Sequence, residues 1–141
     1  MQQLQSHEFE LPFLEGWRDA SQVVLIGPER PVFTPNLQVH REQLGPDESA
    51  EEFFRQQRAE LAQLDGFRLI EHGDRKLAGQ TALSHSYSWS PPELVGSRIR
   101  QTQLALTYAG TLFTITASAL EHEWESIEPA FEHMLSGFRW R

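Results

Sequence analysis

The sequence of 141 residues contains no cysteine, and this absence excludes several kinds of chemistry. Disulfide bonds, thiolate nucleophiles and lipid attachment at an N-terminal cysteine all require that side chain. The sequence also has no apolar run near the roughly 20 residues that a membrane helix needs. Its beginning, MQQLQSHEFELPF, has neither the basic nor the apolar region of a signal peptide. We therefore expect a soluble protein of the cytoplasm.

Positive charge is scarce, with 12 Lys and Arg residues against 20 Asp and Glu residues and a formal net charge of −8. Nucleic-acid binding needs a basic surface, so we expect no nucleic-acid partner. The hydrophobic content of 39% and the aromatic content of 11% are those of a folded protein. The length fits one domain over residues 1–141, because no linker or repeat divides the chain.

Known catalytic and metal-binding motifs are absent from the sequence. His122 is followed by no second histidine at the spacing of a zinc motif, and the other histidines are scattered. There is no G-x-S-x-G motif, no G-x-G-x-x-G motif and no P-loop. The alternating serines after Thr81 fit the polar face of a strand. We therefore expect no metal, no cofactor and no enzymatic activity.

Two segments have helical periodicity. The segment 49–64 places apolar residues at helical spacing, and Ser49 and Glu52 fit the S-x-x-E capping box. The segment WESIEPAFEHMLSGFRW near the end of the chain carries a second apolar stripe. With Ser126 as its N-cap, Pro129 would fall in the first turn, where no intrahelical amide is needed.

The rest of the chain alternates with the period of strands. A turn is predicted at Gly73 and Asp74, and a long hairpin is predicted to turn at Ala109 and Gly110. Strands, a helix, several antiparallel strands and a second helix follow one another. This order predicts an α+β fold with an antiparallel sheet and helices packed on one side.

The stretch SQVVLIGP, residues 21–28, departs from this alternation. Four apolar residues run from Val23 to Ile26, so both faces of this strand are apolar. One face can enter the core of the protein. The second face must meet another layer, another subunit or a ligand.

Several segments together resemble the DcrB-related proteins. They are WRDAS (17–21), the apolar strand after it, FTPNLQVHRE (33–42), LTYAGTLFTITASAL (106–120) and PAFEHMLSGFRW (129–140). The chain is most similar to the cytoplasmic branch of this family, the Eag chaperones of bacterial type VI secretion. The resemblance implies a curved antiparallel sheet backed by helices (a Mog1/PsbP-like fold) and a homodimer. It also implies binding of N-terminal transmembrane helices of secreted effectors that carry a PAAR domain.

In this family, apolar residues of the early strand and of neighbouring sheet positions line the groove for the client helix, and polar side chains contact the helix backbone or its polar residues. Carried over to this sequence, Gln22, Val24 and Ile26 would face the groove, and Val23 and Leu25 would face the helices. Gln101 and Gln103 are the candidates for polar contacts with the client.

Two other functions compete with a chaperone or adaptor. The first is a small-molecule-binding or enzymatic α+β domain, which would have an enclosed pocket with converging polar groups. The second is a purely structural homodimeric subunit, in which a second copy permanently covers the apolar strand.

Overall fold

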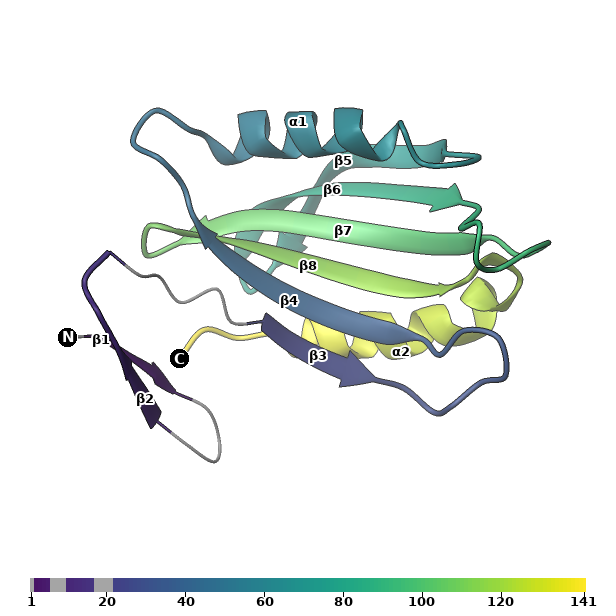
Figure 1. Ribbon diagram of the computed structural model, residues 1–141, viewed down its shortest axis with the longest axis horizontal. Helices are drawn as coiled ribbons and strands as arrows, with labels where there is room; N and C mark the ends of the chain where they lie inside the picture. Colours follow the sequence, from purple (N-terminus) through teal and green to yellow (C-terminus); the bar gives the residue numbers. More distant parts are fainter. Residues whose placement is uncertain (1, 6–9, 17–21) are drawn as a thin grey trace.

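A computed structural model describes residues 2–5, 10–16 and 22–141 of the protein (Figure 1). In it, segments with alternating patterns form strands and segments with helical periodicity form helices. The strands are β1 (Gln2–Gln5), β2 (Glu10–Phe13), β3 (Gln22–Ile26), β4 (Asn36–Gln43), β5 (Arg68–Leu77), β6 (Gln80–Trp89), β7 (Ile99–Tyr108) and β8 (Thr111–Leu120). The helices are α1 (Ala50–Leu61) and α2 (Trp124–Ser136), and a short 3₁₀ turn, η1 (Glu121–Glu123), precedes α2.

Six strands form an open, curved, antiparallel sheet in the order β3-β4-β8-β7-β6-β5 (Figure 1). The strands β3 and β5 are its edges, and β1 pairs with β2 in a separate two-stranded sheet. The α+β class and the curved antiparallel sheet predicted from the sequence are therefore confirmed.

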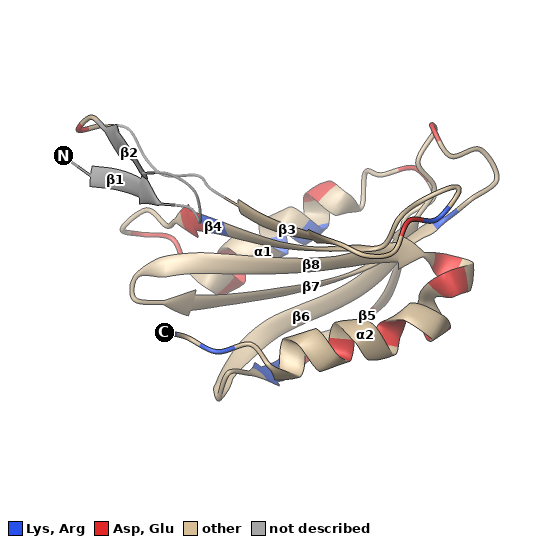
Figure 2. Cartoon of the chain, turned by 90° about the horizontal axis from the view of Figure 1, so that it is seen from below, with Lys and Arg blue, Asp and Glu red and all other residues tan. Residues whose placement is uncertain are grey.

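The two helices lie on opposite faces of the sheet, so the expectation that they share one side was wrong (Figure 2). In α1, Phe54 packs in a cluster with Ala105, whereas Phe131 of α2 belongs to a cluster with Leu104. Because Leu104 and Ala105 are neighbours in one strand, their side chains point to opposite faces. Both are only 1% exposed, so β7 needs a covering layer on each side.

The start of α1 matches the capping pattern. Ser49 is the N-cap in extended conformation, and its side-chain oxygen accepts a hydrogen bond of 3.1 Å from the amide of Glu52. The carboxylates of Glu51 and Glu52 lie in the first turn, where their negative charge interacts favourably with the positive end of the helix dipole.

The tight turns of the sheet were predicted correctly at one of two places. The β7–β8 hairpin turns at Ala109 and Gly110, with φ angles of 51° and 79°. In contrast, β5 runs straight through Gly73 and Asp74, and the chain turns at Ala78 and Gly79 instead. This second turn is also an Ala-Gly pair, with φ angles of 50° and 77°, so residue type does not distinguish it from the turn that was predicted.

The start of α2 also differs from the prediction. The helix begins at Trp124, after η1, so Ser126 is inside it and donates a hydrogen bond to the carbonyl oxygen of Glu123. Pro129 therefore lies within the helix and not in its first turn. A proline there removes one backbone hydrogen bond. The apolar residues Trp124 and Phe131 bury this helix against the sheet and hold it in place.

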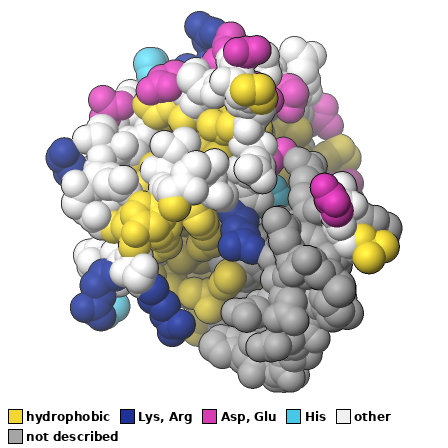
Figure 3. Space-filling view, turned by 90° about the vertical axis from the view of Figure 1, so that its left-hand side faces the viewer, with side chains coloured by type: hydrophobic (Ala, Val, Ile, Leu, Met, Phe, Trp, Pro, Cys, Tyr) yellow, Lys and Arg dark blue, Asp and Glu magenta, His cyan; other side chains and the backbone are white. Residues whose placement is uncertain are grey.

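The C-terminal residues pack against the β7–β8 end of the sheet. The ring of Trp140 stacks on Tyr108 with centroids 4.0 Å apart, and it meets Phe113 and Phe138 edge-on. Its indole nitrogen donates a hydrogen bond of 2.9 Å to Gln80. The end-on view in Figure 3 shows apolar side chains gathered around a hollow on this side of the molecule, with basic side chains beside it.

Replacing Ser49 with alanine should destabilise the protein by about 1 kcal/mol, because the amide of Glu52 loses its capping partner. Urea unfolding followed by circular dichroism measures this difference. The variant Ser49→Asp keeps a capping oxygen and should unfold like the original protein. Equal stability of all three proteins would contradict the role of this cap.

Candidate functional site

The five candidate residues from the sequence lie on one face of the sheet, the face that α1 covers in part. The register carries Val24 across β4 to Gln38, then to Thr116 in β8 and Gln103 in β7. A neighbouring row carries Ile26 through Asn36 and Ser118 to Gln101 in the same way. Gln22 shares this face because it lies two residues from Val24. The β3 and β7 candidates stand at opposite ends of these rows and are not in direct pairing.

The apolar residues of β3 are exposed on both faces. Val24 and Ile26, on the α1 face, are 44% and 73% exposed, and Val23 and Leu25, on the α2 face, are 58% and 50% exposed. The expectation that one face of this strand enters the core was therefore wrong. The cause is position: α2 packs along residues of β7 and β8, and β3 lies beyond it at the sheet edge.

A chain of hydrogen bonds orients Gln101. The indole nitrogen of Trp89 can only donate, and it donates to the side-chain oxygen of Gln101 over 3.2 Å. The amide nitrogen of Gln101 therefore points the other way and donates to the hydroxyl of Ser118 over 2.8 Å. These two hydrogen bonds therefore fix the orientation of the Gln101 side-chain amide within the protein itself.

A second chain of hydrogen bonds starts at His85, which is fully buried. Its Nε2 lies 2.7 Å from the side-chain oxygen of Gln103, whose nitrogen donates to the Thr116 hydroxyl over 3.3 Å. The imidazole stacks on Phe54 of α1 with centroids 4.0 Å apart. Its Nδ1 is buried and has no hydrogen-bond partner among the described residues. Because the side-chain oxygen of Gln103 can only accept, the neutral tautomer with the proton on Nε2 fits best. Burial lowers the pKa of His85, although the bond to Gln103 opposes this shift.

Sequence reasoning missed the residues that hold the glutamines. The segment TALSHSYSW gave the right alternation, with His85 and Trp89 on one face of β6. Which residues of β7 lie opposite His85 and Trp89 depends on the register between β6 and β7, and a single segment of sequence does not show that register. Polar residues on an otherwise apolar strand face were the one available signal.

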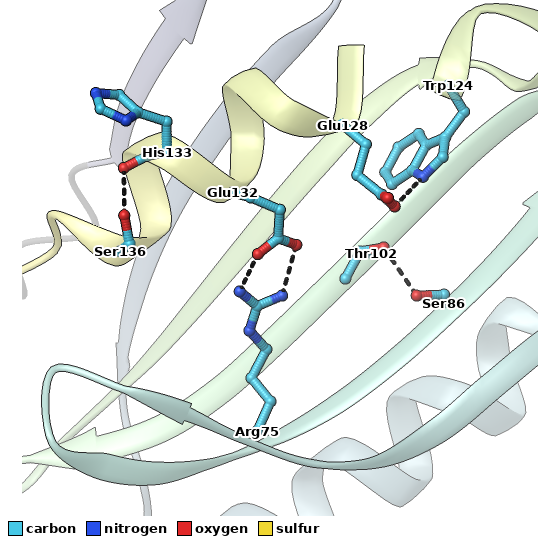
Figure 4. Close-up of polar contacts among 8 residues, drawn as sticks. All are labelled: Arg75, Ser86, Thr102, Trp124, Glu128, Glu132, His133 and Ser136. Atoms are coloured by element: carbon cyan, nitrogen blue, oxygen red, sulfur yellow. Dashed lines mark hydrogen bonds and ion pairs between the residues drawn. The ribbon is translucent and has the colours of Figure 1, made fainter. Parts of the chain in front are cut away.

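The opposite face of the sheet carries a cavity of about 410 Å³ between α2 and strands β5–β7. Its floor includes Ser86 and Thr102, whose hydroxyl oxygens are 2.8 Å apart. From α2, Glu132 pairs with Arg75 of β5, with contacts of 2.9 and 2.5 Å (Figure 4). This ion pair ties the edge of the sheet to the helix. Among the described residues, no cluster of three His, Asp or Glu side chains could hold a metal ion.

These features define an open antiparallel sheet with a helix on each face and a partly uncovered edge. A family model described as DcrB matches residues 7–137, and the chain belongs to this family. No protein in the curated collection that was compared matches the chain. None of the helices in the described ranges is long and apolar enough to cross a membrane.

Solved structures share the fold at low sequence identity. PA94 from Pseudomonas aeruginosa, described as a protein of unknown function and a candidate regulator, is 22% identical with a TM-score of 0.80. The match covers 100% of this chain and 97% of PA94. LpqN of Mycobacterium tuberculosis, described as involved in cell envelope biogenesis, is 18% identical with a TM-score of 0.58, over 94% of this chain and 90% of LpqN. At these identities the similarity shows the fold alone.

Lowering the pH should destabilise the protein in part through His85. The pKa of this residue is lower in the folded state, so below about pH 6.5 the unfolded chain binds more protons and folding weakens. The variant His85→Gln does not titrate and keeps an amide donor for Gln103. Urea unfolding at several pH values should therefore show a smaller loss of stability toward low pH in the variant. Parallel pH profiles would contradict this prediction.

Proposed function

We propose that this protein is a chaperone or adaptor that binds and shields N-terminal transmembrane helices of a type VI secretion effector. It would keep these apolar helices out of water until the effector, which carries a PAAR domain, is loaded onto the secretion spike. In this proposal the protein is cytoplasmic, acts as a homodimer and is not an enzyme.

The observation that carries the proposal is the exposed apolar strand β3. Four consecutive apolar residues, Val23 to Ile26, are each at least 44% exposed. A stable soluble protein normally avoids such a strand at a sheet edge, because it exposes apolar side chains and unpaired backbone groups together. A partner that covers it provides a reason for its presence. Membership in the DcrB family and the resemblance to its Eag branch support an effector transmembrane helix as the proposed partner.

The α1 face of the sheet also suits a helix taken from a membrane. Val24 and Ile26 offer apolar contact, the half-buried Gln38 offers a hydrogen bond beside Val24, and the half-buried Gln101 offers one farther along the same face, on β7. Covering several hundred Å² of apolar surface contributes on the order of 10 kcal/mol at about 25 cal/mol per Å², before the cost of ordering both partners. The net charge of −8 supports solubility while this surface is open.

Replacing Val24 with aspartate should abolish capture of the client. The carboxylate would enter the apolar contact and would have to lose its water on binding. The protein and an N-terminal effector fragment containing its apolar helices are expressed together, and co-purification is measured. The original protein should retain the fragment, and the Val24→Asp variant should lose most of it.

Two control variants distinguish the face that binds. Val95→Asp makes the same change at a residue that is 93% exposed in the 90–97 loop, and it should leave capture unchanged. Val23→Asp places the charge on the opposite face of β3 and should also retain capture. Loss of capture only with Val23→Asp would contradict the assigned face. If the original protein captures nothing and Val24→Asp breaks a dimer, the strand serves self-association and the chaperone proposal fails.

A further inference from the structure

The cavity under α2 has the size and lining of a small-molecule site. Its volume of about 410 Å³ lies within the range of ligand pockets. The sheet supplies hydroxyl groups from Ser84, Ser86 and Thr102, and α2 supplies an apolar wall from Phe131 and Leu135. This cavity lies on the face opposite Val24 and the two glutamines, so the proposed client surface does not explain it.

One cation in this cavity, Arg100, forms no ion pair with any described carboxylate. The guanidinium of Arg100 lies over the ring of Trp124, 4.9 Å from its centroid. Its Nε is buried and has no hydrogen-bond partner in the part of the chain that the structure describes. A partly buried guanidinium is stabilised by a planar carboxylate, which accepts two parallel hydrogen bonds.

An exposed carboxylate beside the same indole, that of Glu128, has one oxygen open to a ligand. One oxygen of Glu128 accepts a hydrogen bond of 2.7 Å from the indole nitrogen of Trp124. Its other oxygen has no hydrogen-bond partner within the described parts of the chain, whereas the neighbouring Glu132 is paired with Arg75. In Figure 4, Glu128 and Glu132 extend from α2 toward the strands that carry Ser86, Thr102 and Arg75.

Arg100 and Glu128 therefore flank one aromatic ring without pairing with each other. We propose that the cavity binds a small zwitterion, an α-amino acid with an apolar side chain. Its carboxylate pairs with Arg100, its ammonium group pairs with the free oxygen of Glu128, and its side chain lies against Phe131 and Leu135.

The charges around the cavity select a zwitterion over a simple anion. Glu132 and Arg75 neutralise each other, and Glu71 and Asp74 on β5 add two further carboxylates to the lining. This acidic surrounding disfavours a ligand that carries only negative charge. A ligand with a positive group a few bonds from its carboxylate meets an opposite charge at both ends.

Thermal unfolding with and without L-leucine tests this proposal on the full-length protein, and calorimetric titration gives the affinity. L-leucine should raise the unfolding temperature, because a ligand that binds the folded state stabilises it. Leucine amide lacks the carboxylate and N-acetyl-leucine lacks the ammonium group, so neither should do so. No shift with L-leucine at about 10 mM, a concentration that would reveal even weak binding, would overturn the proposal. Equal shifts with all three compounds would overturn it as well.

Two variants assign the binding to the named residues. Arg100→Gln and Glu128→Gln should each weaken leucine binding at least about tenfold, which is the loss expected for a hydrogen bond between charged groups. Glu128→Gln keeps the side-chain oxygen that accepts from Trp124, so it should fold even if Arg100→Gln does not. The matched control is Glu125→Gln, which makes the same change on the exposed side of α2 and should bind leucine as before. Unchanged binding by Glu128→Gln would contradict the proposed site.

Discussion

The pairing of β7 with β8 is the constraint on which the rest of the structure depends. Their register runs from Ile99 opposite Leu120 to Tyr108 opposite Thr111, and the hairpin turn between them fixes it. Both faces of this pair carry apolar residues, so each face must be covered. The helix α1 packs on one side through Ala105 and Leu112, and α2 packs on the other side around Leu104. The outer strands extend from this centre in both directions.

Local features of this arrangement could be predicted from the sequence. The capping of α1 at Ser49 and the turn at Ala109 and Gly110 depend on a few adjacent residues, and both were found where expected. The face on which each helix packs could not be predicted in this way. Alternation shows only which residues of a strand share a face, not which helix covers that face. The two faces of β7 look alike in the sequence, since Leu104, Ala105 and Leu106 are consecutive apolar residues. A sheet with one helix on each side and a sheet with both on one side therefore predict nearly the same pattern.

The candidate site also combines features that the sequence predicts with features that it does not. The residues Gln22, Val24 and Ile26 share a face with Gln101 and Gln103, as the resemblance to the Eag chaperones implies. The partners that orient these glutamines, Trp89 and His85, come from β6 and depend on cross-strand register. The exposure of Val23 and Leu25 was missed for a third reason. It depends on how far α2 reaches across the sheet, which is a property of packing and not of the strand.

The strand β3 has a consequence for the protein when it is alone. It contains no charged residue and no proline, the two devices that most often protect an edge strand from other chains. No other described strand pairs with its outer edge. Short apolar segments of high β-propensity and no charge are also those that assemble into cross-β fibrils. We therefore expect the segment QVVLI to limit the concentration at which the free protein avoids aggregation, and synthesis together with a partner that covers this strand would raise that limit.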